Sequence, residues 1–231
     1  MTFLVFRKEC DFKEEIPLSA AEIRHVRARR LRKADEVLVG DGRELHYQAG
    51  FSSDMKKLVI LDDPPRKRKE PFRIACTSLP SGNRLDWMLQ KSAELGVTHI
   101  LPILCSRSGR VKFSSERAER IIHEAAVQSE RFFLPEVYEP VKLKDSFSFI
   151  ENNITDQALH TFLYTGSAPS FTEVQCEKPV SFFIGPEGDF DEQEISFFNE
   201  MQVRPYSLGN TILKVETAVL AALAVLSAKS I

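Results

Sequence analysis

The chain changes its sequence pattern at one charged, proline-containing segment, and this break constrains the fold more than any other feature. Residues 62–69 read DDPPRKRK, a run that buries no apolar side chain and that two prolines hold extended. We therefore predict a linker at about residues 63–70. It separates a first domain, residues 1–68, from a second domain, residues 71–231.

The first domain is predicted to consist of short strands. Its apolar runs are brief, and turn signals such as Gly40-Asp41-Gly42 separate them. The expected strands are Phe3–Phe6, Val37–Val39, Leu45–Phe51 and Leu58–Leu61. This pattern predicts a small β-barrel.

In the second domain, strand-like runs alternate with helical periodicity. The expected strands are Phe72–Leu79, His99–Leu104, Leu159–Tyr164, Val180–Ile184 and Pro205–Leu208, and the expected helices include Arg84–Leu95, Ser115–Glu130 and Glu216–Ala228. Asp191, followed three residues later by Glu194, predicts a capping box that opens a further helix. The last helix is apolar nearly all round and is expected to be well buried. Such alternation predicts an α/β fold with a mostly parallel sheet.

Composition excludes several classes of protein. The four cysteines are far apart and form no CxxC pair, so we expect neither a metal site nor a disulfide framework, and a reducing cytoplasm fits best. The N-terminus lacks the long apolar run of an export signal. The longest uncharged run, Thr217–Ala228, is shorter than the roughly 18 residues that a membrane helix needs. Neither GxGxxG nor a Walker motif occurs, which disfavours a dinucleotide or nucleoside triphosphate site.

Charge is distributed unevenly along the chain. Up to residue 70, Lys and Arg outnumber Asp and Glu, and beyond it the reverse holds. The densest basic stretch spans residues 24–33, and its candidate contacts to a polyanion are Arg24, His25, Arg27, Arg30 and Arg32. A run of this kind is usually a solvated helix face. The asymmetry favours a polyanionic partner for the first domain.

Three strand ends in the second domain could together form a ligand pocket. The most informative is Phe182–Phe190, an apolar strand that stops in the turn Gly185-Pro186-Glu187-Gly188. The other two are Leu163–Ser167 and Tyr206–Leu213, each of which places a glycine among small polar residues. Ligands of α/β sheets bind at carboxyl ends of strands, and glycine permits close approach to the backbone. A tight turn without a ligand explains the first segment equally well.

In their order, several motifs resemble the RsmE family, the bacterial 16S ribosomal RNA uridine-N3 methyltransferases of the SPOUT superfamily. The resemblance covers nearly the whole chain. Its marks are Arg84-Leu85-Asp86-Trp87 with Gln90-Lys91 and Glu94-Leu95-Gly96-Val97; Glu124-Ala125-Ala126 with Gln128 and Arg131; Gly185-Pro186-Glu187-Gly188; and Leu208-Gly209 with Ile212-Leu213 and Glu216-Thr217-Ala218. Any one of these could be chance, whereas the ordered set is specific.

The resemblance implies a PUA-like β-barrel followed by a SPOUT domain whose chain threads a deep trefoil knot. It also implies a homodimer whose active site the partner subunit completes, and S-adenosylmethionine as cofactor. The implied reaction is methylation of a uridine N3 of 16S ribosomal RNA, on the assembled 30S subunit. The basic stretch of the first domain would then contact RNA. The implied cofactor-binding residues are Leu163, Tyr164, Thr165, Ile184, Gly185, Pro186, Glu187, Gly188, Ser207, Leu208, Gly209, Thr211, Ile212 and Leu213.

Methyl transfer to N3 needs a proton acceptor and a cation that stabilises the uridine anion. Arg131, at the family's Gln-x-x-Arg position, is the candidate cation, although an arginine at a helix C-terminus could simply satisfy the helix dipole. Glu187 and Glu216 are the candidate bases. Glu187 is preferred, while either carboxylate could instead serve structure, as a loop hydrogen-bond acceptor or as a helix cap.

Three positions depart from the family pattern. Ser81 stands where a lysine is usual, Asp189 replaces the second glycine of GPEGG, and Lys214-Val215 replaces Arg-Thr. Asp189 places a carboxylate beside the implied cofactor loop, where it could disturb the backbone or bind the cofactor's amino group. These departures keep two alternatives open: a non-catalytic RNA-binding or ribosome assembly factor of the same fold, and a SPOUT methyltransferase that acts on another RNA atom.

Overall fold

The computed structural model describes residues 3–7, 15–61, 66–67, 70–109 and 112–229. The chain divides into two compact units, one formed by residues 1–70 with 126–134 and the other by residues 71–125 with 135–231. Most of the predicted linker, residues 62–65 and 68–69, lies outside the described residues, as does Cys10. Each unit is described by itself below.

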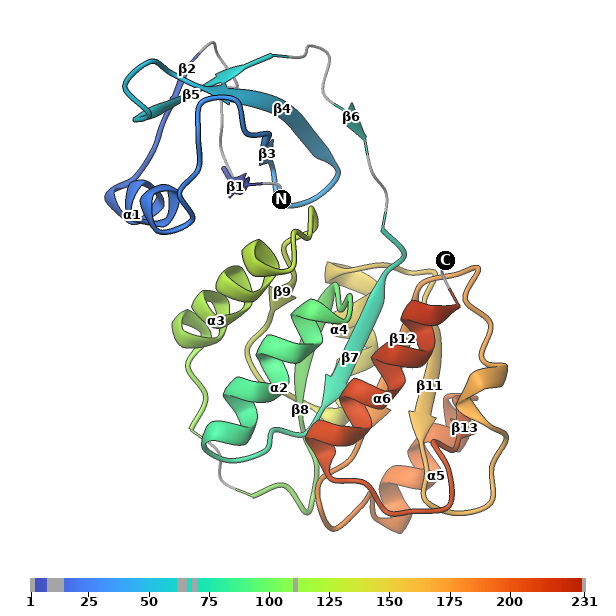
Figure 1. Ribbon diagram of the computed structural model, residues 1–231. Coiled ribbons are helices and arrows are strands. Elements are labelled where there is room, and N and C mark those ends of the chain that lie inside the picture. Colours follow the sequence, from blue (N-terminus) through green and yellow to red (C-terminus); the bar gives the residue numbers. More distant parts are fainter. Residues whose placement is uncertain (1–2, 8–14, 62–65, 68–69, 110–111, 230–231) are drawn as a thin grey trace. The chain divides into compact units, whose positions relative to one another are not determined.

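The first unit contains a six-stranded sheet, coloured blue to cyan in Figure 1. Its strands are β1 (Phe3–Phe6), β2 (Glu15–Pro17), β3 (Val37–Gly40), β4 (Leu45–Phe51), β5 (Lys57–Ile60) and β6 (Arg66–Lys67). The order is β1-β3-β4-β5-β2, with β6 on β4, and only β1 and β3 are parallel. No pairing joins β1 to β2 among the described residues. The sheet is therefore a half-barrel, and the predicted small β-barrel is not confirmed.

The one helix described within residues 15–61 is α1 (Ala20–Ala28), which the sequence analysis did not predict. A capping box starts it, because Ser19 Oγ accepts from the Glu22 backbone and Glu22 Oε2 accepts from the Ser19 backbone. Arg30 ends it with a left-handed φ of 53°. In this conformation the Leu31 N–H reaches the Val26 carbonyl at 3.1 Å, as in a Schellman motif.

A segment distant in sequence completes the first unit. Helix α3 (Ser115–Gln128) runs across the division between the units, and residues 126–134 belong to the first one. Ala126, Phe132 and Leu134 pack in one apolar cluster with Phe6 and its neighbours. The Leu134 N–H donates to the Gly42 carbonyl at 2.7 Å. The first unit thus includes a segment that is separated from the rest of it by residues 71–125.

The second unit is built on a parallel sheet, as predicted. Its strands are β7 (Arg73–Thr77), β8 (His99–Leu104), β9 (Glu136–Val137), β10 (Val141–Lys142), β11 (Leu159–Leu163), β12 (Val180–Ile184) and β13 (Arg204–Tyr206). The order is β10-β8-β7-β12-β11-β13, with β9 also on β8, and every pairing is parallel. The strands β8 and β12 have the predicted bounds. The central strands β7 and β12 are buried throughout, as expected for a parallel sheet covered on both faces.

Helices cover both faces of this sheet. On one face α2 (Asn83–Glu94) packs beside α6 (Val215–Ala228), which contacts β7 and β12; Figure 1 shows α6 in red in front of these strands. On the other face α4 (Ser146–Asn153) and α5 (Glu192–Glu200) contribute to a phenylalanine-rich core. Phe147 stacks on Phe183 at 4.9 Å between ring centroids, and Phe162 stacks on Phe198 at 4.6 Å.

Two helix predictions have different outcomes. The capping box before α5 is confirmed, because Asp191 Oδ1 accepts from the Glu194 N–H at 2.8 Å and Glu194 Oε2 accepts from the Asp191 N–H at 2.9 Å. The prediction that the last helix is well buried is wrong in part. Ala222 and Leu223 of α6 are fully buried, but Ala224 is exposed and Leu220 half-buried. Helix α6 therefore keeps an apolar face open to solvent.

The helix α4, the short strand β10 and the one-turn 3-10 helices at Leu143–Asp145 and Phe171–Glu173 were not predicted. Over the described residues, no helix combines the length and apolar character that a membrane span requires.

Candidate functional site

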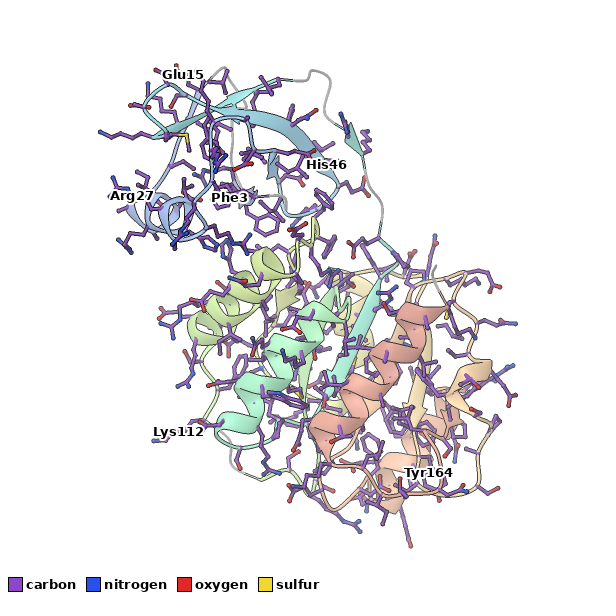
Figure 2. All side chains as sticks on the ribbon, in the orientation of Figure 1. Phe3, Glu15, Arg27, His46, Lys112 and Tyr164 are labelled. Atoms are coloured by element: carbon purple, nitrogen blue, oxygen red, sulfur yellow. The ribbon has the colours of Figure 1, made fainter. Side chains whose placement is uncertain are left out.

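A pocket of about 300 Å³ lies at the carboxyl ends of three neighbouring strands of the second unit. The strands β12, β11 and β13 are adjacent in the sheet, so the loops that follow them converge. The lining residues are Leu163, Tyr164, Thr165, Ile184, Gly185, Pro186, Glu187, Gly188, Asp189, Leu208, Gly209, Thr211, Ile212, Leu213, Val215 and Ala218. Figure 2 labels Tyr164, which directly follows β11. We call this the acidic pocket, for the charge described below.

The structure brings together every predicted cofactor-binding residue except Ser207. The Ser207 hydroxyl instead bonds within its own turn, donating to the Gly209 carbonyl at 3.1 Å. Its backbone N–H donates to Pro169, and its carbonyl accepts from Phe171. Ser207 therefore shapes the loop after β13 and does not line the pocket.

Three lining residues were absent from the sequence-based set. Val215 and Ala218 lie in the first turn of α6. They could have been predicted from the sequence, because this turn comes just after the predicted loop Leu208–Leu213. Asp189 directly follows the predicted residue Gly188; it was noted as a departure from the family pattern that could bind the cofactor's amino group, but it was not placed in the set.

The loop after β12 leaves little space for a side chain at Gly185. A Cβ on Gly185 would lie 3.2 Å from the Phe190 nitrogen and 3.3 Å from its ring, closer than ordinary contact. Gly209 has a φ of 128°, which L side chains rarely adopt. Both glycines therefore let the backbone line the pocket directly, where its amides and carbonyls can meet a ligand.

Asp189 occupies a left-handed position, with a φ of 59°. Asp and Asn tolerate this conformation better than other non-glycine residues, because their short side chains bond locally. Here Asp189 Oδ1 accepts from the Phe190 N–H at 2.8 Å, and Oδ2 accepts from the Thr165 hydroxyl at 2.8 Å. The backbone geometry that a glycine would supply is thus kept, and the side chain ties the loop after β12 to the loop after β11.

The charge of the acidic pocket is of one sign. Its lining includes two carboxylates, Glu187 and Asp189, and none of the described residues that line it is Lys, Arg or His. No ion pair joins Asp189 to a cation among the described residues. A pocket of this kind favours a ligand that carries positive charge and disfavours phosphate groups.

Arg84 lies between the two candidate bases. Its guanidinium is 2.8 Å from Glu187 Oε1 and 3.8 Å from Glu216 Oε1. The hydrogen bond to Glu187 and the charge of Glu216 raise the pKa of Arg84. Glu187 is 68% exposed and lines the pocket, whereas Glu216 is 6% exposed and does not. Among the described residues, Glu216 Oε2 has no hydrogen-bond partner. Of the two carboxylates, only Glu187 is placed to reach a bound ligand.

Arg131, the predicted catalytic cation, belongs to the first unit. It is 8% exposed and forms an ion pair with Glu70, which is also largely buried. It is not among the residues that line the acidic pocket. The resemblance implies a site completed by a partner subunit, so a catalytic role for Arg131 stays a prediction, while its contact with Glu70 is structural.

The predicted RNA-binding residues lie together on α1 and the turn that follows it. Arg24, Arg27, Arg30 and Arg32 are exposed, and Arg27 projects outward from α1 in Figure 2. His25 is half-buried, with its ring edge-on to Phe3 at 5.7 Å between centroids. Burial, followed by the charge of Arg29, lowers the pKa of His25. At neutral pH the positive charge of this surface therefore comes from the arginines.

The described residues contain no group of His, Cys, Asp or Glu side chains that could hold a metal ion.

These features define a class: an α/β domain with a ligand pocket at the carboxyl ends of adjacent parallel strands, closed by an apolar C-terminal helix. A family model described as RNA methyltransferase domain matches residues 68–227. The chain belongs to this RNA methyltransferase family and, within it, to the ribosomal RNA small subunit methyltransferase E proteins, which confirms the resemblance drawn from the sequence.

Two of the relatives of that name match nearly all of the chain. The protein of Synechocystis sp. is 30% identical over 97% of this chain and 77% of its own length, and that of Bacillus subtilis is 28% identical over 93% and 91%. Among solved structures, a probable rRNA-methyltransferase from Porphyromonas gingivalis has a TM-score of 0.79 at 25% identity, covering 99% of both chains. The ribosomal RNA small subunit methyltransferase E of Neisseria gonorrhoeae, bound to S-adenosyl methionine, has a TM-score of 0.81 at 24% identity, covering 99% of this chain and 98% of its own. The last likeness shows a shared fold.

Proposed function

We propose that this protein is an S-adenosylmethionine-dependent methyltransferase that acts in the cytoplasm on N3 of a uridine in 16S ribosomal RNA, on the assembled 30S subunit. The observation that carries the proposal is the acidic pocket, which gathers the residues that the family resemblance assigns to the cofactor. Related proteins bear the name ribosomal RNA small subunit methyltransferase E. The acidic pocket is the proposed cofactor site.

The chemistry of the pocket fits this cofactor. S-adenosylmethionine supplies a methyl group on a positively charged sulfur, and a pocket whose only charged lining groups are carboxylates favours such a cation. Apolar side chains such as Leu163, Ile184 and Leu213 offer surfaces for an adenine ring. The exposed backbone at Gly185 and Gly209 offers hydrogen-bonding groups for its edge.

Glu187 is the proposed proton acceptor. It lines the acidic pocket and is exposed enough to meet an RNA base. The base must approach in line with the sulfur–methyl bond, so the protein must also hold the nucleotide out of its stack. We retain Arg131 as a candidate cation supplied by a partner subunit.

The first unit is proposed to contact RNA as a PUA-like domain, through Arg24, His25, Arg27, Arg30 and Arg32. Four of these side chains are exposed arginines on one helix and its following turn, and no ion pair joins Arg24, Arg27 or Arg30 to a carboxylate among the described residues. Guanidinium groups without a carboxylate partner are available to phosphates.

We further propose that the protein is a homodimer that uses the open face of α6. Only one residue of this helix, Glu216, is charged, yet Leu220, Ala221, Ala224 and Val225 remain partly or fully exposed. Apolar surface of this kind is stabilised by burial against a partner. Light scattering coupled to size-exclusion chromatography should give twice the mass of the chain for the wild type. The chain mass for Ala224→Glu would support the assignment, and a monomeric wild type would contradict it.

The implied trefoil knot is proposed for the second unit. The strand order supports it, because β12 returns to the middle of the sheet, between β7 and β11. Stretching the unfolded chain between residues 71 and 229 tests it. An unknotted chain extends to roughly 3.3–3.6 Å per residue, and a knotted chain should reach a shorter end-to-end length. An end-to-end length equal to that of an unknotted chain would exclude the knot.

The proposed activity is tested with labelled S-adenosylmethionine and small ribosomal subunits from a strain that lacks the endogenous enzyme, followed by nucleoside analysis. We expect 3-methyluridine. Gly185→Val, whose side chain would clash with Phe190, should lose cofactor binding and transfer together. Label on a different atom would support the second alternative, a related RNA methyltransferase.

A protein that binds RNA but no cofactor would be the non-catalytic factor. The left-handed backbone of Asp189, which its short side chain tolerates, gives that alternative little support.

A further inference from the structure

A second pocket, of about 450 Å³, shares a wall with the acidic pocket. The loops after β7 and β8 form most of it, and Pro186, Glu187, Gly188 and Val215 line both pockets. Its volume falls in the range of about 300–1,000 Å³ that is usual for ligand sites. Two cavities separated by a single loop have the arrangement that a group transfer between two bound molecules requires.

The second pocket carries the opposite charge. Its lining includes two guanidinium groups, those of Arg84 and Arg107, against one carboxylate, that of Glu187, and we therefore call it the basic pocket. Arg84 donates to the Ser81 hydroxyl at 3.2 Å as well as to Glu187. Arg107 donates to the Gly188 carbonyl at 2.6 Å, which places its guanidinium on the shared wall. One of its five N–H donors is used in this bond, so others can serve a ligand.

Neutral hydrogen-bonding groups also line the basic pocket. The Ser78 and Ser108 hydroxyls are 3.3 Å apart, and the Ser108 hydroxyl accepts from the Cys105 N–H at 2.9 Å. Burial raises the pKa of the adjacent Cys105 thiol to about 12, so this thiol adds no negative charge at neutral pH. The surroundings suit the carbonyl oxygens of a pyrimidine and leave the two arginines as cations.

We propose that the basic pocket receives the methyl acceptor, a uracil base of RNA, and that Arg84 and Arg107 stabilise its anion. This inference rests on the proposed function. The base loses its N3 proton to the Glu187 carboxylate, and its negative charge spreads onto the carbonyl oxygens, which accept N–H bonds from the arginines. The N3 lone pair then forms the bond to the methyl carbon as the sulfur–methyl bond breaks, and that electron pair returns to the sulfur.

The charges of the two ligands explain why the two pockets carry charges of opposite sign. The acidic pocket suits the sulfonium cation, the basic pocket suits the uracil anion, and both ligands become neutral once the methyl group has moved. Interactions that exist only while the charges exist lower the barrier of the chemical step. Arg84 is held for this role by Glu187 on one side and by the buried Glu216 on the other.

The test compares arginine variants of equal charge. Arg84→Gln and Arg107→Gln each remove one guanidinium from the basic pocket, and Arg117→Gln is the matched control. Arg117 lines neither pocket and pairs with Asp86 on the surface. A fourth variant, Gly109→Trp, fills the pocket sterically, because Gly109 lines only the basic pocket and a Cβ there meets no atom within 4 Å.

Four quantities are measured for each purified variant: the thermal midpoint, the Kd for S-adenosylmethionine by calorimetry, and kcat and KM for methyl transfer to small ribosomal subunits. We expect the Arg84 and Arg107 variants to lose about 100-fold or more in kcat, the usual cost of removing one preorganised donor. Cofactor affinity and thermal midpoint should stay near those of the control. The pH at which kcat is half-maximal should rise in both variants, since the anion then forms without the guanidinium.

Several outcomes would overturn the assignment. Wild-type kcat in both arginine variants would exclude stabilisation of the anion by this pocket, and unchanged transfer by Gly109→Trp would exclude the base from it. Loss of cofactor binding in parallel with activity would assign the arginines to the acidic pocket. A wild-type protein that binds S-adenosylmethionine but methylates no uridine would instead refute the proposed function itself.

Discussion

The Thr165 hydroxyl donates a hydrogen bond of 2.8 Å to Asp189 Oδ2, and this bond joins two of the loops that form the acidic pocket. Asp189 stands where the family usually has glycine, and it takes up a left-handed backbone conformation. Asp189 therefore adds a carboxylate to the lining of the pocket and ties two of its loops together. Its consequences for ligand choice can be measured.

Asp189→Asn should weaken the preference of the pocket for a cationic ligand. The amide oxygen can still accept from the Phe190 N–H, and the amide nitrogen can donate to the Thr165 hydroxyl oxygen, whereas the charge is lost. Affinity for S-adenosylmethionine should therefore fall by about fivefold, or ~1 kcal/mol, as for a partly exposed ion pair. Affinity for the neutral product S-adenosylhomocysteine should hardly change. Calorimetry with both ligands gives the ratio of their two Kd values. Thr165→Val, which removes the loop contact and keeps the carboxylate, is the control, and an unchanged ratio in Asp189→Asn would contradict the electrostatic role.

Removing arginines from α1 should reduce RNA affinity in a salt-dependent way. In a variant with Arg24→Gln and Arg27→Gln, the slope of log Kd against log salt should fall by about 0.7 for each lost phosphate contact. Filter binding with small-subunit RNA at several salt concentrations gives the slope. Lys56→Gln with Lys57→Gln, on the β4–β5 hairpin, removes equal charge from the same unit. Equal slopes for the two double variants would mean that α1 makes no specific contact.

The ion pair of Arg131 and Glu70 should contribute to the stability of the first unit. Arg131→Met alone leaves a largely buried carboxylate without its partner, so we expect a loss of about 3–5 kcal/mol in the free energy of unfolding. Adding Glu70→Leu should restore most of it, because two apolar side chains then replace the pair. Urea denaturation measures each variant. A single substitution without effect would show that the pair is not buried in solution.

Stability should decrease on acidification because of His160. Its Nδ1 lies 2.6 Å from the Ser181 hydroxyl, its ring packs edge-on against Phe147, and burial lowers its pKa. The unfolded chain then binds a proton near pH 6.5 while the folded chain does not, so stability is full above that pH and falls as pH drops below it.

Urea midpoints between pH 7.5 and pH 5 check this expectation for His160. In His160→Gln the urea midpoint should depend less on pH. His25, whose pKa is also lowered by burial, should account for part of the remaining pH dependence. An identical slope in wild type and His160→Gln would place the titrating group elsewhere.

Much of the second unit could be predicted from local sequence. The bounds of β8 and β12 were correct because each is a mostly apolar run between helix and turn signals, a pattern that burial on both faces imposes. The capping box of Asp191 and Glu194 was correct because its geometry depends only on residues three apart. Short edge strands such as β2, β6 and β10 were missed, because two or three residues carry no period and their pairing partners lie far along the chain.

The sequence by itself determined the family, the alternation that builds the parallel sheet and nearly all of the acidic pocket, since these depend on ordered motifs and local periodicity. Tertiary structure alone decided which distant groups meet. It placed Arg131 against Glu70 in the first unit, Arg84 between two carboxylates, and Arg107 on the carbonyl of Gly188. Such contacts arise because the order of strands in the sheet and the closure of loops bring together residues that are far apart in sequence. The spacing of residues along the chain predicts neither the strand order nor the loop closure.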